Sequence, residues 1–135
     1  MKYLLDTNTC IAHLRGKTPT LTARLAATAP GEVVLCSIVK AELIFGVLRS
    51  SKPVENRRQL DGFFAGLSSL PFDDLAAEEY GRIRAYLTVA GTPIGPNDLL
   101  IAAIAIANRL TVVTRNVGEF GRVPGIAVED WQATL

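Results

Sequence analysis

The sequence predicts an α/β fold, a three-layer α/β/α sandwich with a mostly parallel central sheet. Short apolar runs alternate along the chain with longer segments of helical periodicity, the pattern of repeated β-α-β units. The chain has 135 residues, 49% of them hydrophobic, which fits one domain spanning residues 1–135. Asp6 comes too early for a signal peptide and no apolar run approaches the ~20 residues that cross a bilayer, so a cytoplasmic protein is expected.

Five short apolar segments are predicted to be strands. Residues 3–5 end at an acid, residues 32–36 are rich in β-branched valine, and residues 70–72 contain a proline that suits a sheet edge. Residues 110–114 form the clearest later strand, and a last short strand is expected near residues 126–128. A polar, glycine-containing loop is predicted between these two, over residues 115–124.

The helices are placed by capping residues and by apolar spacing. Thr7, Asn8 or Thr9 is expected to cap the first helix, Ser37 the third, and Asp73 or Asp74 a long one. The predicted helical ranges are 10–14, 20–29, 38–48, 54–67, 74–90 and 99–108. The last of these is apolar nearly all round, so it should be buried.

Acidic and amide side chains stand where the predicted strands meet the helices. Asp6 follows the first strand directly, Glu42 lies in an otherwise apolar helix, and Asp98 lies in the first turn of the buried helix. Asn116 and Glu119 follow the strand over residues 110–114, and ligand sites form at the carboxyl ends of parallel strands. Each also has a structural interpretation: a helix cap, an ion pair, a favourable place on the helix dipole or a turn residue.

Several carboxylates gathered at one pole of a sheet require a cation or bound protons. Two of them ~4 Å apart repel by ~4 kcal/mol at an effective dielectric constant of ~20. Oxygen ligands favour Mg²⁺ or Mn²⁺, which would activate water and offset charge on a phosphoryl group. The residues therefore predict a phosphodiester hydrolase.

The other reactive residue types give weaker signals. His13 is the one histidine, has no evident catalytic partner and is expected on the surface. Cys10 and Cys36 lie in apolar stretches and are expected to be buried, free thiols rather than a zinc site or disulfide. An aspartyl phosphotransfer protein of the haloacid dehalogenase type is disfavoured because Asn8 stands where a second aspartate is needed.

The net charge of +1 gives little overall attraction to nucleic acid. Basic residues do cluster locally, and RNA phosphates would have to meet a local patch of this kind. The cluster consists of Arg49, Lys52, Arg57 and Arg58.

Taken in order along the chain, these motifs resemble the PIN-domain family, and within it the VapC toxins of bacterial toxin–antitoxin pairs. The matching stretches are residues 4–8, Ser37 with residues 41–43, residues 94–107, residues 111–116, residues 119–120, residues 123–126 and residues 130–131. Each motif is weak alone, but their joint order and spacing are specific and cover nearly the whole chain.

The resemblance implies a PIN fold and an endoribonuclease that depends on Mg²⁺ or Mn²⁺. Asp6, Glu42 and Asp98 match the acids of the family's metal site, and Glu119 is implied to complete it. The fourth acidic position of many PIN domains falls near Asn116, an amide here, which leaves the number of metal ions open. Thr7, Ser37 and Thr114 are implied as supporting hydroxyls, and Arg115 as a contact to substrate phosphate.

The resemblance also implies partners. The opening residues 6–11 are similar to those of VapC toxins that cut initiator tRNA in its anticodon loop. A cognate VapB antitoxin is implied, as are a homodimer and a higher toxin–antitoxin assembly. Phe45, Phe63 and Phe64 could form a contact surface or simply belong to the core. The alternative function is a degenerate PIN scaffold that binds RNA or a protein without cleavage, and the amide at position 116 is its one support.

Overall fold

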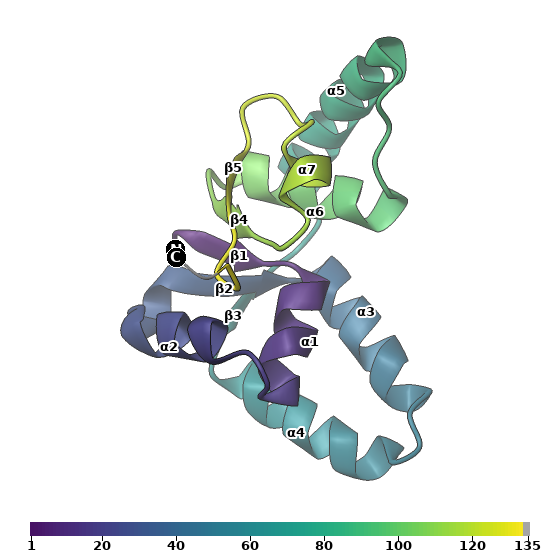
Figure 1. Ribbon diagram of the computed structural model, residues 1–135. Coiled ribbons are helices and arrows are strands. Elements are labelled where there is room, and N and C mark those ends of the chain that lie inside the picture. Colours follow the sequence, from purple (N-terminus) through teal and green to yellow (C-terminus); the bar gives the residue numbers. More distant parts are fainter. Residues whose placement is uncertain (134–135) are drawn as a thin grey trace.

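Five parallel strands form the middle layer of the molecule (Figure 1). The computed structural model describes residues 1–133. The strands are β1 (Tyr3–Leu5), β2 (Val33–Cys36), β3 (Ser68–Leu70), β4 (Thr111–Val113) and β5 (Ala127–Glu129). Their order across the sheet is β3-β2-β1-β4-β5, and every neighbouring pair is parallel. The predicted α/β/α sandwich is confirmed, with a sheet that is parallel throughout the described residues.

Helices cover both faces of this sheet. They are α1 (Thr7–Arg15), α2 (Pro19–Ala27), α3 (Ser37–Leu48), α4 (Pro53–Ala65), α5 (Asp74–Ala90), α6 (Pro96–Ala107) and the short α7 (Val117–Phe120), and a 3₁₀ turn spans Pro30–Glu32. Figure 1 shows α1, α2 and α4 on one side of the sheet and α5, α6 and α7 on the other. Because the chain crosses the sheet between β3 and β4, β1 and β4 become neighbours at its centre.

The core lies on both faces of the sheet, and one part of it lies between the central strands and α6. Leu4, Leu5 and Val112 are fully buried, as is the run Ile101–Ala105 of α6. Alanines in that run let the helix approach both the sheet and α5, along which it packs. The prediction of a buried helix here is confirmed. Within the described residues, no helix is long and apolar enough to cross a membrane.

Several predicted element boundaries are wrong, each for a local physical reason. The cap of α1 is Asp6, whose Oδ1 accepts the Thr9 N–H at 2.9 Å, so this helix begins three residues before the predicted start. Ser37 is the first residue of α3 rather than its cap. β3 ends before Pro71, which has no N–H to donate to a ladder, and the predicted loop over residues 115–124 contains α7.

The predictions for the two cysteines are confirmed, and the one for the histidine is wrong. Cys10 and Cys36 are buried and free, which confirms that prediction, and burial raises the pKa of both thiols. His13 is half-buried rather than on the surface, with its ring centroid 5.5 Å from that of Phe63. Burial lowers the His13 pKa, which favours the neutral ring.

The three phenylalanines named as a possible contact surface separate in the structure. Phe63 and Phe64 pack partly buried against the core, whereas Phe45 on α3 is 60% exposed. Leu48, one turn further along α3, is 64% exposed. Of the three phenylalanines, Phe45 on α3 is therefore the exposed one, and the two α4 aromatics pack against the core.

Candidate active site

The first site residue, Asp6, lies where β1 and β4 end side by side. Leu5 pairs with Val113, so the next residues, Asp6 and Thr114, meet at the carboxyl end of the sheet. The Thr114 hydroxyl donates to Asp6 Oδ2 at 2.6 Å, while the α1 backbone occupies Oδ1. Asp6 is only 4% exposed, so its carboxylate is fixed in place by hydrogen bonds and burial.

Glu42 reaches the same region from α3. This helix starts directly after β2, the neighbour of β1, and buries Val39 and Leu43 beneath it. Glu42 is half-buried, and its Oε1 accepts a hydrogen bond from the Thr7 hydroxyl at 2.7 Å. Thr7 is the first residue of α1, so the residue after Asp6 positions Glu42.

Asp98 and Glu119 come from the two helices on the opposite side of the sheet. Asp98 is in the first turn of α6 and is half-buried. Glu119 lies on α7, and its Oε1 accepts the backbone N–H of Gly95, the cap of α6, at 2.5 Å. A Cβ at Gly95 would lie 3.3 Å from that oxygen, so the absence of a side chain there permits the close approach.

The pKa of Asp98 depends on the three other acids. The pKa of Asp98 is raised from 3.8 to about 7, first by burial and then by the charge of Glu119. The charge of Asp6, a hydrogen bond with Glu119 and the charge of Glu42 raise it further. Every acid that acts on Asp98 is thus one of the predicted site residues, and together they form a carboxylate cluster: Asp6, Glu42, Asp98 and Glu119.

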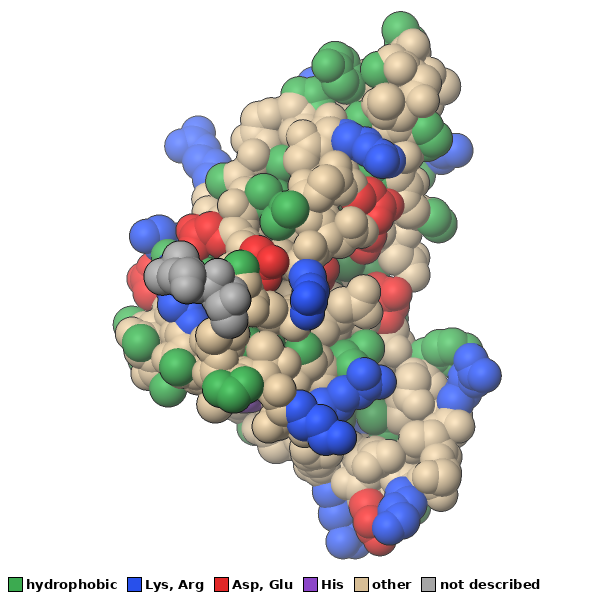
Figure 2. All heavy atoms as spheres, in the orientation of Figure 1, with side chains coloured by type: hydrophobic (Ala, Val, Ile, Leu, Met, Phe, Trp, Pro, Cys, Tyr) green, Lys and Arg blue, Asp and Glu red, His purple; other side chains and the backbone are tan. Residues whose placement is uncertain are grey.

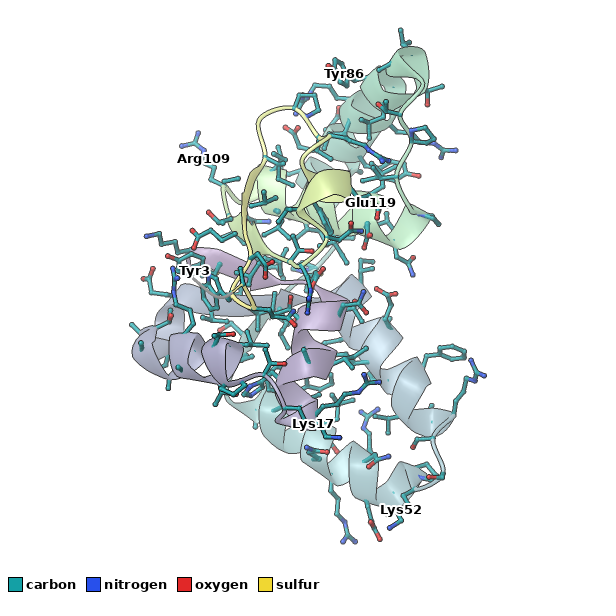
Figure 3. The ribbon with its side chains drawn as sticks, viewed as in Figure 1. Tyr3, Lys17, Lys52, Tyr86, Arg109 and Glu119 are labelled. Carbon is teal, nitrogen blue, oxygen red and sulfur yellow. The ribbon has the colours of Figure 1, made fainter. Side chains whose placement is uncertain are left out.

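The views of the surface and side chains agree with this placement. Figure 2 shows acidic side chains where the helices on the α5–α7 side meet α3, with one basic side chain beside them and others farther out. Figure 3 shows Glu119 on α7 beside the start of α6. The cluster is therefore open to a substrate from this face.

The predicted supporting residues divide into two groups. Asn116 donates its backbone N–H to the Thr114 hydroxyl at 2.9 Å and its side-chain amide to Glu119 Oε2, so it holds two neighbours of the cluster. Arg115 is exposed beside them and makes no ion pair within the described residues. The Ser37 hydroxyl instead donates to the Leu70 carbonyl at 3.5 Å, and no hydrogen bond among the described residues joins it to the acids.

Two residues that support the cluster were missed as site residues in the sequence. The buried Thr9 gives its N–H to Asp6, and its hydroxyl donates to the Val113 carbonyl at 3.1 Å, joining α1 to β4. The spacing from Asp6 to Thr9 is that of a cap and the third helical residue, a signal that was available. Gly95 carries no side chain, and only its backbone contact to Glu119 reveals its place.

The donor chemistry of the cluster fits a hard divalent cation. Carboxylate oxygens are the ligands that Mg²⁺ and Mn²⁺ prefer, and a cation would relieve the repulsion that raises the Asp98 pKa. In residues 1–133, no three acidic, histidine or cysteine side chains are already arranged to hold one ion. The acids are instead engaged with protein donors: Asp6 with Thr114, Glu42 with Thr7 and Glu119 with Gly95.

Thr114→Val is expected to destabilise the metal-free protein by about 1–3 kcal/mol, because it leaves a buried Asp6 oxygen and the Asn116 N–H unpaired. Urea unfolding in EDTA would measure this. Thr111→Val is the matched control, since Thr111 lies on β4, three residues before Thr114, and its hydroxyl makes no hydrogen bond within the described residues. Equal stability of the two variants would contradict the role given to Thr114.

Comparison with known proteins extends over the whole site. A family model described as PIN domain matches residues 3–126. The chain is 41% identical over 131 residues to the tRNA(fMet)-specific endonuclease VapC of Salmonella typhimurium, covering 97% of this chain and 98% of that protein. It is 39% identical over 132 residues to Ribonuclease VapC2 of Rickettsia felis, with the same coverage of both chains.

A solved structure matches equally well. The crystal structure of DNA-bound VapBC from Salmonella typhimurium contains a chain that aligns with a TM-score of 0.92 and 41% identity. The alignment covers 97% of this chain and 98% of that one, so all elements that carry the carboxylate cluster lie within it.

Proposed function

The chain belongs to the PIN-domain family, and within it to the VapC ribonucleases. We propose that it is the toxin of a VapBC pair and that it hydrolyses RNA at its carboxylate cluster with Mg²⁺ or Mn²⁺. One observation carries the assignment of the site. Asp6, Glu42 and Glu119 come from separate parts of the chain, and all three act on Asp98 near the carboxyl end of the central strands. Holding half-buried like charges this close costs stability, as the raised Asp98 pKa indicates, so we infer that a function maintains the cluster.

The roles of the residues follow from their contacts. Asp6, Glu42 and Asp98 would hold the cation, and Glu119 would complete its surroundings while joining α7 to the start of α6. Thr7, Thr114 and Asn116 orient these carboxylates through hydrogen bonds. A bound Mg²⁺ or Mn²⁺ would supply positive charge at the scissile phosphate and acidify the attacking water. Arg115 is free to contact an adjoining phosphate.

The substrate we propose is initiator tRNA, cut in its anticodon loop. The Salmonella typhimurium relative, at 41% identity, is named a tRNA(fMet)-specific endonuclease, which supports this choice. Bases in a loop are unstacked and can be reached by protein side chains. Such a substrate would place the reaction in the cytoplasm.

The partner we propose is a VapB antitoxin, because the matching solved structures are of VapBC complexes. A groove of about 320 Å³ between α1, α3 and α4 is lined by apolar side chains and by polar ones, which include Glu42 and Arg15. An antitoxin segment in this groove could place a basic side chain on the carboxylate cluster and block the site. Exposed Phe45 and Leu48 on α3 extend the apolar surface available to this assembly and to a homodimer.

The experiment that tests the function is cleavage of total tRNA by purified protein free of antitoxin. We expect discrete fragments with Mg²⁺ or Mn²⁺, none in EDTA, and recovery on adding the metal back. Sequencing the fragment ends would show whether initiator tRNA is cut in its anticodon loop. Folded, antitoxin-free protein that yields no fragments from any RNA and binds no Mn²⁺ would instead be a scaffold without activity.

A further inference from the structure

A second cavity, of about 320 Å³, lies between α5 and the segment that leads into α6. One wall consists of Tyr80, Arg84 and Leu87 from α5. The other wall includes Ile94, Pro96 and Leu99. The walls are mostly apolar, with one aromatic ring and one cation, and none of the roles assigned above uses this cavity.

The cavity adjoins the carboxylate cluster through its second wall. Ile94 and Pro96 flank Gly95, whose N–H binds Glu119, and Leu99 directly follows Asp98. Consecutive Cα atoms are about 3.8 Å apart, so the cavity lies within reach of the nucleotides next to a phosphate held at Asp98. The same turn of α6 thus faces the acids with one side chain and the cavity with others.

Tyr80 is held rigidly at the cavity. Its ring is half-buried and meets the Phe72 ring edge to face, with centroids 6.0 Å apart and an interplanar angle of 86°. Its hydroxyl accepts a hydrogen bond from the Arg84 guanidinium at 2.9 Å. A fixed aromatic ring beside apolar side chains provides a surface on which a base can pack.

Arg84 supplies a positive charge that the described residues do not neutralise. It is exposed, no carboxylate of residues 1–133 lies within ion-pair distance, and its guanidinium lies 5.9 Å from the Tyr80 ring centroid. Arg82, two residues earlier on α5, is instead paired with Glu79. RNA is a polyanion that must approach four carboxylates, so an unpaired cation on the wall of this cavity would favour its binding.

We propose that this cavity is an RNA subsite, which takes the base of a nucleotide flanking the scissile phosphate against Tyr80 and the phosphate of that nucleotide on Arg84. The inference rests on the proposed ribonuclease function and adds how the substrate strand is held. Single-stranded RNA is commonly bound by this combination of an aromatic face and an arginine.

The test measures RNA binding by fluorescence anisotropy in an Asp6→Asn background, where cleavage does not interfere. The probes are a labelled initiator-tRNA anticodon stem–loop and a labelled oligouridine. Tyr80→Ala and Arg84→Gln should each weaken binding about tenfold, and Arg84→Gln should also lower the salt dependence by about one phosphate contact. Tyr80→Phe keeps the ring, so it should retain most of the affinity and exclude a folding defect as the cause.

Matched controls lie on the same helix. Arg82→Gln removes a cation that is already paired, and Tyr86→Ala removes an aromatic ring that is 55% exposed and does not line the cavity (Figure 3 labels it on α5). Both should bind RNA like the parent protein. A further test uses active protein and an RNA substrate that lacks the base of one nucleotide beside the scissile phosphate. Loss of this base should raise the KM of the wild type several-fold and change the KM of Tyr80→Ala little.

The alternative outcomes are distinct. If Tyr80→Ala and Arg84→Gln bind like the controls while the wild type cleaves RNA, the subsite is wrong and the ribonuclease stands. If light scattering shows that these variants alter the oligomeric state while RNA binding is unchanged, the cavity belongs to a protein interface and the proposal is overturned. If folded wild type neither cleaves nor binds RNA, the proposed function itself fails.

Discussion

Asp6→Asn is expected to lower RNA cleavage at least about a thousandfold while leaving the protein folded, since loss of a metal-site charge costs several kcal/mol of transition-state stabilisation. The asparagine oxygen can still accept the Thr9 N–H and so keep the cap of α1. Its amide nitrogen can donate to the Thr114 hydroxyl, which reverses the direction of the hydrogen bond that Asp6 accepts now. Shape is preserved and only the charge is lost.

A matched control comes from a second aspartate with the same local geometry. Asp73 caps α5, and its Oδ1 accepts the Ala76 N–H at 3.0 Å, but it is not among the acids that act on Asp98. Initial rates on tRNA with Mn²⁺ should be unchanged in Asp73→Asn, and circular dichroism should show both variants folded. Full activity in Asp6→Asn would mean that Asp6 is a helix cap and nothing more.

The sheet and the general place of the site could be predicted because apolar runs mark strands and acids mark their ends. Leu4 and Leu5 form a buried strand, and Asp6 follows them directly, which places it at the carboxyl edge of the sheet. Glu42 stood out because it interrupts an apolar helix, and Asp98 because it opens one. These signals are local in sequence and survive folding.

The contacts that hold the acids could not be predicted, because they join residues distant in the chain. Thr114 binds Asp6 across 108 positions, and Thr7 binds Glu42 across 35. The amide at position 116 suggested a decayed site, but in the structure the Asn116 side chain donates to Glu119, while its backbone N–H donates to Thr114. This positioning role removes the one observation that favoured an inactive scaffold.

Ser37 shows the opposite error. The family resemblance implied a supporting role, but a residue at the first position of a helix projects according to the direction of the helix. That direction takes the Ser37 hydroxyl toward the Leu70 carbonyl on β3, away from β1 and Asp6. The sequence contains no signal for this, because it depends on how α3 is oriented on the sheet.

Asp98→Asn is expected to abolish cleavage and, at the same time, to stabilise the metal-free protein at pH 8. The pKa of Asp98 is about 7 in the folded protein, because burial and neighbouring acids disfavour its charge. An unperturbed aspartate, as in the unfolded chain, has a pKa of 3.8. Between these two pH values the folded protein keeps a proton that the unfolded chain has released. The stability that the proton gives is complete below pH 3.8 and is lost as the pH rises toward about 7.

Asparagine carries no charge at any pH, so the variant should escape this loss. After allowance for solvent screening we expect a gain of about 1 kcal/mol at pH 8, or a rise in Tm of roughly 3–6 °C, with a smaller difference at pH 5. Thermal unfolding in EDTA at the two pH values would measure it. Adding Mn²⁺ should then stabilise the wild type more than the variant, because Asp98 would be one of the ligands.

The sign of the change at pH 8 separates the two interpretations of Asp98. If this acid served the helix dipole, its neutralisation would destabilise α6 by a few tenths of a kcal/mol up to about 1 kcal/mol. Asp74→Asn is the control for that effect, since Asp74 is an exposed acid in the first turn of α5. We expect Asp74→Asn to lower Tm slightly and Asp98→Asn to raise it. If the Tm falls in both variants, Asp98 serves the helix dipole as Asp74 does. If the two Tm values shift in opposite directions, keeping the Asp98 carboxylate in the cluster lowers the stability of the fold.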